Sequence, residues 1–138
     1  MHNQYRTKHQ VDDLKWNSEI AKIAQAYSEK LALNPLERSS NTYKGEILGE
    51  NLYKSKGIIG KEVTFEWYRE VDNYDFSTHS PKIDRIAGHF TQLVWKETKE
   101  IGCGAACFGS CCAFICNYYP AGNSMDYMTL MHFLTKLQ

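Results

Sequence analysis

The chain has 138 residues, of which 43% are hydrophobic, so it is long enough for one packed core and we expect a single domain over residues 1–138. Lys plus Arg and Asp plus Glu balance at 16 each, and no basic stripe or tail is present, which argues against nucleic acid as a partner. No apolar run approaches the ~20 residues that a membrane-spanning helix needs, so no transmembrane segment is expected.

Two helices are expected near the start of the chain. Residues 2–10 are a short helix candidate, and Asn17 with Ser18 resembles the cap of a second helix that runs to Leu33. Pro35 ends this helix, because the residue before a proline disfavours helical backbone. An apolar stripe at helical spacing is expected to be buried: Ile20, Ile23, Ala24, Tyr27 and Leu31.

The centre of the chain is expected to alternate loops with short elements. Residues 36–48 form a polar loop, and residues 49–54 form a short strand or an extended segment. Gly57 and Gly60 then precede a helix over residues 61–73.

Glu70 breaks the pattern of this helix. It falls within the apolar face that Val63, Trp67 and Tyr74 define. Burial of a carboxylate without a partner is unfavourable. We therefore expect Glu70 to lie at a cavity edge or to be paired inside one; the alternative is that the helix rim is solvated there.

The second half is expected to hold a loop, a short helix and two strands. Residues 75–87 form the loop, and residues 86–95 form the helix, with His89 on the flank of its buried face. The strands span residues 101–108 and 112–119. The inward face of the helix is expected to be Ile86, Phe90, Leu93 and Val94.

The five cysteines predict a cross-linked hairpin. In an antiparallel pairing, a register that places Cys103 opposite Cys116 also places Cys107 opposite Cys112, on the same face of the sheet. We therefore predict two stacked disulfides, Cys103–Cys116 and Cys107–Cys112, with a connection over residues 108–111.

Cys111 is left free at the tip of this hairpin. A metal site is the alternative for the cluster, although pairs on one face of a tight hairpin give poor tetrahedral geometry. A catalytic Cys111 is a further alternative, but the sequence marks no nearby base that would activate the thiol.

Clustered cysteines favour an oxidising compartment, where local disulfides persist. Residues 1–15 are polar and charged and contain no signal peptide. We therefore expect the mature or truncated domain of an extracellular, secreted protein. A cytosolic chain that begins at Met1 is the alternative.

Four segments carry a distinctive combination of residues: Gly49-Glu50-Asn51-Leu52-Tyr53, Gly88-His89-Phe90-Thr91-Gln92-Leu93-Val94-Trp95, Ile101-Gly102-Cys103-Gly104 and Cys116-Asn117-Tyr118-Tyr119-Pro120-Ala121-Gly122-Asn123. Together they closely resemble the CAP superfamily, which comprises cysteine-rich secretory proteins, insect venom antigens and plant pathogenesis-related proteins. The resemblance covers about residues 2–123. It implies an α+β fold, a three-layer α-β-α sandwich with a central antiparallel sheet.

The resemblance also implies a large cleft that holds two histidines and two glutamates. Glu50 matches the glutamate of the Gly-Glu-Asn-Leu motif, Glu70 that of the Trp-Tyr-x-Glu helix, and His89 the histidine of the Gly-His-Phe-Thr-Gln motif. Three more residues are expected to support this cleft by hydrogen bonds: Asn51, Gln92 and Asn117.

The first histidine of the family pattern is missing. Arg38, or Ser39 on a one-residue shift, occupies its position. Two histidines with carboxylates suit zinc, whereas a zinc or other divalent site made of His89, Glu50 and Glu70 fits less well, so no cofactor is required. Arg38 is instead expected to pair with Glu50 or Glu70.

The resemblance implies a non-enzymatic secreted protein that binds a sterol, a fatty acid or a host or defence partner, with residues 75–87 as the sterol-side element. One alternative is a metal-dependent hydrolase or peptidase, with Glu50 or Glu70 as base and His89 as polariser or ligand. The other is a protein-interaction module with a degenerate cleft. It would bind through surface loops or a C-terminal stripe at helical spacing: Met125, Met128, Met131, Leu134 and Leu137.

Overall fold

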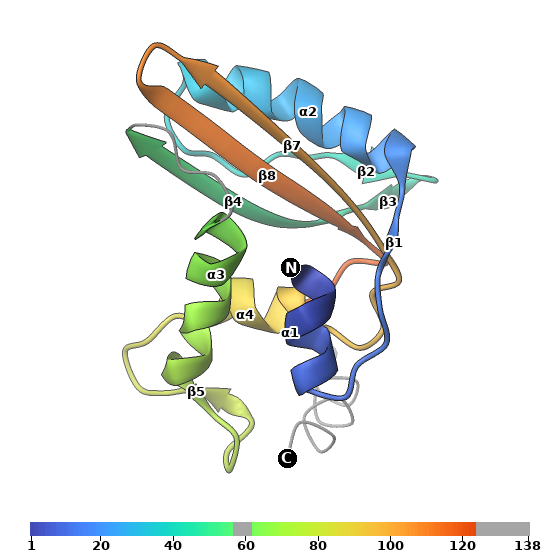
Figure 1. Cartoon of the computed structure of the whole chain (residues 1–138), viewed down its shortest axis with the longest axis vertical. Coiled ribbons are helices and arrows are strands. Elements are labelled where there is room, and N and C mark those ends of the chain that lie inside the picture. The colour runs from blue at the N-terminus through green and yellow to red at the C-terminus, as the bar shows by residue number, and fades with distance from the viewer. Residues whose placement is uncertain (57–61, 124–138) are drawn as a thin grey trace.

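Two layers of helices enclose one β-sheet, which confirms the expected three-layer α-β-α sandwich (Figure 1). Helix α2 (Ser18–Leu33) covers one face of the sheet. The other face carries α1 (His2–Lys8), α3 (Glu62–Tyr68) and α4 (Gly88–Leu93). Among the described residues, no helix is both long and apolar enough to span a bilayer.

The computed structural model describes residues 1–56 and 62–123. Several expectations fall outside these residues. They are the break before the helix at Gly57 and Gly60, the start of that helix at Lys61 and the C-terminal apolar stripe from Met125 to Leu137.

The central sheet has the strand order β1-β7-β8-β4. Its members are β1 (Lys15–Trp16), β7 (Glu100–Phe108), β8 (Cys111–Tyr119) and β4 (Gly49–Lys56). Strand β8 pairs antiparallel with both β7 and β4, whereas β1 pairs in parallel with β7. Of the two alternatives for residues 49–54, a short strand or an extended segment, the structure has the strand, which is two residues longer. Because a two-residue strand has no hydrophobic period, the sequence offers no signal for β1.

The sheet separates two hydrophobic cores. Successive residues of β8 alternate between them, as the two-residue period of a strand requires. The core under α2 includes Ala24, Leu31, Leu52, Ala113 and Ile115. The core on the opposite face includes Trp67, Phe90, Trp95, Cys116 and Tyr118.

Helix α2 begins after its predicted cap, Asn17, whose side chain accepts two main-chain N–H groups of the first turn. The helix lies very close to the sheet, because a Cβ on Gly104 would come within 2.4 Å of the Cα of Gln25. Small side chains, Ala24 and Ser28, are therefore buried at the contact. Because of this close approach, the buried face of the helix differs from the predicted stripe. Two large members of that stripe are only half-buried: Ile23 and Tyr27.

The predicted polar loop over residues 36–48 contains a small hairpin. Strands β2 (Thr42–Tyr43) and β3 (Glu46–Ile47) pair antiparallel. Lys44 and Gly45 connect them with positive φ angles of 52° and 78°. This left-handed backbone matches the twist of a two-residue hairpin, and glycine at the second position adopts it without strain.

The two predicted helices after residue 60 are both shorter than expected. The first is α3, followed by the 3-10 helix η1 (Arg69–Asn73). The second is α4, which begins after Ala87. Ile86 therefore precedes the helix and is 72% exposed, so its predicted inward orientation is wrong. The loop before α4 contains one more short pair, β5 (Tyr74–Asp75) with β6 (Ser80–Pro81).

The cysteine hairpin forms in the predicted register. Cys103 pairs with Cys116 and Cys107 with Cys112, and both pairs are disulfide-bonded, with Cα–Cα distances of 4.1 and 4.0 Å. Cys111 is free. The connection is tighter than predicted, because β8 already begins at Cys111.

We expect the two disulfides to differ in what they contribute to stability. They join residues 13 and 5 positions apart. The chain-entropy model then assigns about 3 kcal/mol to Cys103–Cys116 and about 2 kcal/mol to Cys107–Cys112. Double alanine variants of each pair, unfolded in urea, should show losses in this order, whereas Cys111→Ala should change the free energy of unfolding little. Protein isolated without reductant should have one free thiol per chain; five would contradict both bonds.

Candidate functional site

Glu70 and His89 form a hydrogen-bonded pair between η1 and α4. The ring Nδ1 of His89 lies 2.5 Å from Oε1 of Glu70. The other carboxylate oxygen accepts the main-chain N–H groups of His89 at 2.9 Å and of Phe90 at 3.3 Å. Ala87 precedes α4 and provides no side-chain cap. Glu70 therefore orients the imidazole and also caps the helix, and its carboxylate has the partner that its apolar surroundings require.

Arg6 holds the other end of α4. Its guanidinium is fully buried and donates through Nη1 to the carbonyl oxygens of Leu93 at 3.1 Å and Trp95 at 3.0 Å. Nη2 donates to the carbonyl of Thr98 at 3.2 Å, and Nε to that of Asp12. Burial lowers the pKa of Arg6 to about 10, so the group is still charged at neutral pH. A cation thus meets the last carbonyl of α4 and two carbonyls beyond it, and an anion meets the N–H groups at the start of the helix.

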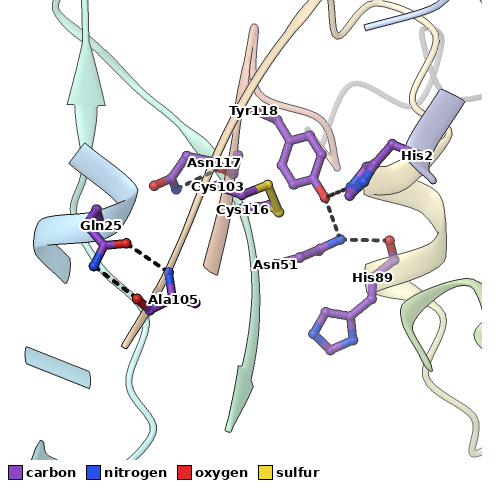
Figure 2. The surroundings of a disulfide bond; sticks show 10 residues. His2, Gln25, Asn51, His89, Cys103, Ala105, Cys116, Asn117 and Tyr118 are labelled. Atoms are coloured by element: carbon purple, nitrogen blue, oxygen red, sulfur yellow. Dashed lines mark hydrogen bonds between the residues drawn. A yellow bond between two sulfur atoms is a disulfide. The ribbon is translucent and has the colours of Figure 1, made fainter. Parts of the chain in front are cut away.

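A chain of hydrogen bonds joins α1, β8, β4 and α4 (Figure 2). Nδ2 of Asn51 donates to the Tyr118 hydroxyl and to the main-chain oxygen of His89, both at 3.1 Å. Burial and nearby positive charge, including that of Arg6, lower the pKa of His2 to about 3. The His2 ring is therefore neutral at pH 7, and its Nε2 accepts the Tyr118 hydroxyl proton at 2.7 Å.

Glu50 on β4 is buried and fully engaged by the chain itself. Its Oε1 accepts the main-chain N–H of Ser39 at 2.9 Å, and its Oε2 accepts the Ser39 hydroxyl and, at 3.2 Å, Nδ2 of Asn117. Ser39, rather than Arg38, is the residue that meets this carboxylate. Through its hydrogen bonds to Ser39, the Glu50 side chain therefore holds the loop of residues 36–41 against the sheet.

Arg38 makes a different contact from the one expected. Its Nη1 donates to the main-chain oxygen of Glu50 at 3.4 Å. Within residues 1–56 and 62–123, no ion pair joins Arg38 to Glu50 or to Glu70, so that expectation is wrong. The physical reason is the one-residue offset, because the shorter Ser39 already fills the space beside the Glu50 oxygens.

Gln92 holds the end of the sheet against the turn that follows β8. It is buried, and its Nε2 lies 3.3 Å from the Thr98 hydroxyl, while its Oε1 accepts the N–H of Gly122 at 2.9 Å. A Cβ on Gly122 would come within 2.6 Å of the same side chain, so this turn needs a glycine. Gln92 thus has a framework role.

Three cavities lie around these residues. One of about 250 Å³ is lined by Leu36, Glu37, Arg38, Leu52 and His89. A second, of about 420 Å³, borders Arg38 on its other side and reaches Glu50 and Gln92. Arg38 therefore stands between two halves of the cleft, and His89 and Glu50 line different halves.

The third cavity is a groove of about 520 Å³ between α3 and the β7–β8 hairpin. Its wall on α3 includes Val63, Thr64 and Trp67, and its floor is formed by the Cys103–Cys116 disulfide with Phe114. Gln25 closes one side, since its amide bonds both the N–H and the carbonyl of Ala105 (Figure 2).

The residues of the cleft do not fit a zinc ion. Zinc sites in proteins use three or four nitrogen, sulfur or oxygen ligands. The described residues contain no group of three or more His, Cys, Asp or Glu side chains that could hold a metal. Glu70 occupies the Nδ1 of His89, which leaves Nε2 as the ring nitrogen that could bind a metal, but both oxygens of Glu50 accept hydrogen bonds from the chain and the described residues form no set of three ligands around this nitrogen. The candidate set of His89, Glu50 and Glu70 is therefore not assembled as a ligand group.

We expect Glu70 to stabilise the fold. Glu70→Ala removes a helix cap and should lower the free energy of unfolding by about 2 kcal/mol. Glu70→Gln keeps the shape but loses the charge, and should lower it by about 1 kcal/mol. Urea unfolding of the purified variants measures both values.

Glu66→Gln is the matched control on α3. Glu66 forms an exposed ion pair with Arg69, so the change should be under about 0.5 kcal/mol. If Glu70→Gln were as stable as the unchanged protein, or more stable, Glu70 would behave as a strained functional carboxylate, and the structural role would be wrong.

Comparison with known proteins agrees with this architecture. The model of the cysteine-rich secretory protein family, CAP, matches residues 1–118. Human Golgi-associated plant pathogenesis-related protein 1 is 42% identical over 128 residues, which cover 91% of this chain and 81% of that protein. Mouse glioma pathogenesis-related protein 1 is 33% identical over 132 residues, and the match spans 89% of this chain but only 51% of that protein.

The fold also matches solved structures. Schistosoma mansoni venom allergen-like protein 4 superposes with a TM-score of 0.67 at 24% identity, over 86% of this chain and 83% of that one. At this identity the likeness concerns the fold alone. The family match and the human relative extend over most of the sequence, and this chain therefore belongs to the CAP family.

Proposed function

We propose that this protein is a non-enzymatic binding module that takes an apolar ligand, a sterol or a fatty acid, in the groove between α3 and the β7–β8 hairpin. The groove is the observation that carries the proposal. Its volume of about 520 Å³ lies within the ~300–1,000 Å³ of small-molecule sites. Its walls are mainly apolar and combine Val63, Trp67 and Phe114 with a disulfide, while His2, Gln25 and Thr64 contribute polar groups.

This position differs from the loop expected to contact sterol. No residue of the 75–87 segment lines the groove. Phe76 instead packs against Tyr74 and Phe90, with ring centroids 5.0 and 6.3 Å away. The loop therefore supports the core, and the proposed ligand lies on the face of the sheet that carries α3.

The state of the cleft carboxylates weighs against hydrolysis. A general base needs a lone pair directed at a water or a substrate proton. The oxygens of Glu50 face Ser39 and Asn117, and those of Glu70 face His89 and Phe90. A metal-dependent peptidase therefore has less support than a binding protein.

A protein-interaction module is the second candidate. The observation that favours it is the pair of exposed isoleucines before α4, since Ile83 is 90% and Ile86 72% exposed. Contiguous exposed apolar side chains are typical of contact surfaces, and these two residues are three positions apart in the sequence. This candidate predicts partner binding without uptake of lipid.

We also propose an oxidising location, outside the cell or within the secretory pathway. Two disulfides support it, as does the secretory character named in the family description. A cytosolic location is the alternative. The thiol count given above decides between them, since a reducing compartment would leave five thiols.

Filling the groove should abolish lipid uptake. Thr64→Trp places an indole in the groove from α3, and we expect it to weaken binding of cis-parinarate and of tritiated cholesterol to delipidated protein at least about tenfold. The matched control is Phe65→Trp on the same helix, because Phe65 is 45% exposed and does not line the groove. Fluorescence titration and filter binding give the affinities. Equal binding by a folded Thr64→Trp variant, or no uptake by the unchanged protein, would sink the proposal.

A further inference from the structure

Most N–H donors of the Arg38 guanidinium have no hydrogen-bond partner among the residues that the structure describes. Within the described part of the chain, Arg38 makes one hydrogen bond, at 3.4 Å, to the main-chain oxygen of Glu50. A guanidinium has five N–H donors in a planar fork. Most of this fork is therefore available to a ligand in the cavity that Arg38 lines.

The cavity of about 250 Å³ places this cation beside an oriented imidazole and two leucines. His89 lines the same cavity, and since Glu70 holds its Nδ1, the ring presents Nε2 as its second polar atom. Nε2 has no hydrogen-bond partner among residues 1–56 and 62–123. Leu52 is buried and provides an apolar wall, and Leu36, which is 60% exposed, borders the open side.

We propose that this cavity binds a small organic monocarboxylate. The planar carboxylate matches the fork of Arg38, and a short apolar portion contacts Leu36 and Leu52. His89 faces the ligand through Nε2. The inference concerns a cavity separate from the lipid groove and does not depend on the proposed function.

The size and charge of the cavity select this class of ligand. At about 250 Å³ the volume lies just below the ~300 Å³ at which drug-sized sites begin, which suits a short chain rather than a long lipid tail. Glu37 lines the same cavity and opposes a negative ligand. One arginine against one glutamate leaves little excess positive charge, so a monoanion suits the site better than a phosphate dianion.

The same residues explain why an anion replaces the cation that the resemblance implies. Arg38 brings positive charge to the segment where the family pattern has its first histidine, and Ser39 is the residue that lies beside Glu50. Ser39 satisfies Glu50, so that this carboxylate needs no cation. Together, the two adjacent residues change the charge preference of the cleft.

Hexanoate is the probe, and hexanamide is its neutral counterpart. Hexanoate should shift the ring resonances of His89 in a saturable manner in ¹H–¹³C spectra of the full chain, and hexanamide should not. Arg38→Gln should weaken hexanoate binding about tenfold, the effect of one charge-assisted hydrogen bond. Arg85→Gln, a change at an exposed arginine outside both cavities, should leave binding unchanged. Glu37→Gln should strengthen it.

The proposal is overturned if hexanamide binds as well as hexanoate, or if Arg38→Gln binds hexanoate like the unchanged protein. Tighter binding of palmitate than of hexanoate at the His89 resonances would also overturn it, because a long-chain lipid would then be the occupant. Thr64→Trp should leave hexanoate binding unchanged, because Thr64 lines the groove and not this cavity. Loss of lipid binding and loss of hexanoate binding can therefore be observed separately, and each tests its own proposal.

Discussion

Helix α4 depends on two charged side chains, one at each end. It has only six residues, too few to be stable alone. Glu70 accepts the N–H groups at its start, and the buried Arg6 donates to the carbonyl oxygens at and beyond its end. Each charge has the sign that stabilises its end of the helix dipole. Because α4 carries both His89 and Gln92, this clamp places the cleft residues relative to the sheet.

The clamp also limits what the cleft can do chemically. The Glu70 carboxylate accepts three hydrogen bonds from His89 and Phe90, so most of its about four acceptor positions are already occupied. Glu50 is engaged in a similar way by Ser39 and Asn117, although it belongs to β4 rather than to a helix. Both acidic residues of the family pattern thus contribute to the framework of this chain. Among the described residues, Arg38 and the Nε2 of His89 keep polar atoms open to the cleft.

Local regularities made part of this structure predictable. The hairpin register follows from a period of two residues and from cysteine spacing, and both lie within one short segment. A partner for Glu70 was predictable, because a carboxylate on an apolar helix face must be compensated. The family motifs place His89 in the same cleft but do not pair it with Glu70, and Arg38 was the expected partner. The role of Arg6 was missed, since its acceptors Leu93, Trp95 and Thr98 lie 87 to 92 residues away and are main-chain atoms without a sequence signal.

Other differences arise where two elements meet. The buried face of α2 includes Ser28, because glycine in β7 lets the helix lie close to the sheet. The periodicity of the helix alone does not reveal this close approach. Ser39 lies beside Glu50, where Arg38 was expected. The two positions differ by one residue in a loop, where no sequence period fixes the direction of a side chain. Ile86 was placed inward because it continues the apolar spacing of α4, yet the helix starts two residues later.

The central claim is that the acidic residues of the cleft support the fold and do not gather a metal. Calorimetric titration of Zn²⁺ into the full chain at neutral pH, beside Glu50→Gln and His89→Ala, tests it most directly. The account predicts no one-to-one binding heat that either variant removes. A stoichiometric site that disappears in both variants would contradict it, and would favour metal-assisted hydrolysis over the binding function.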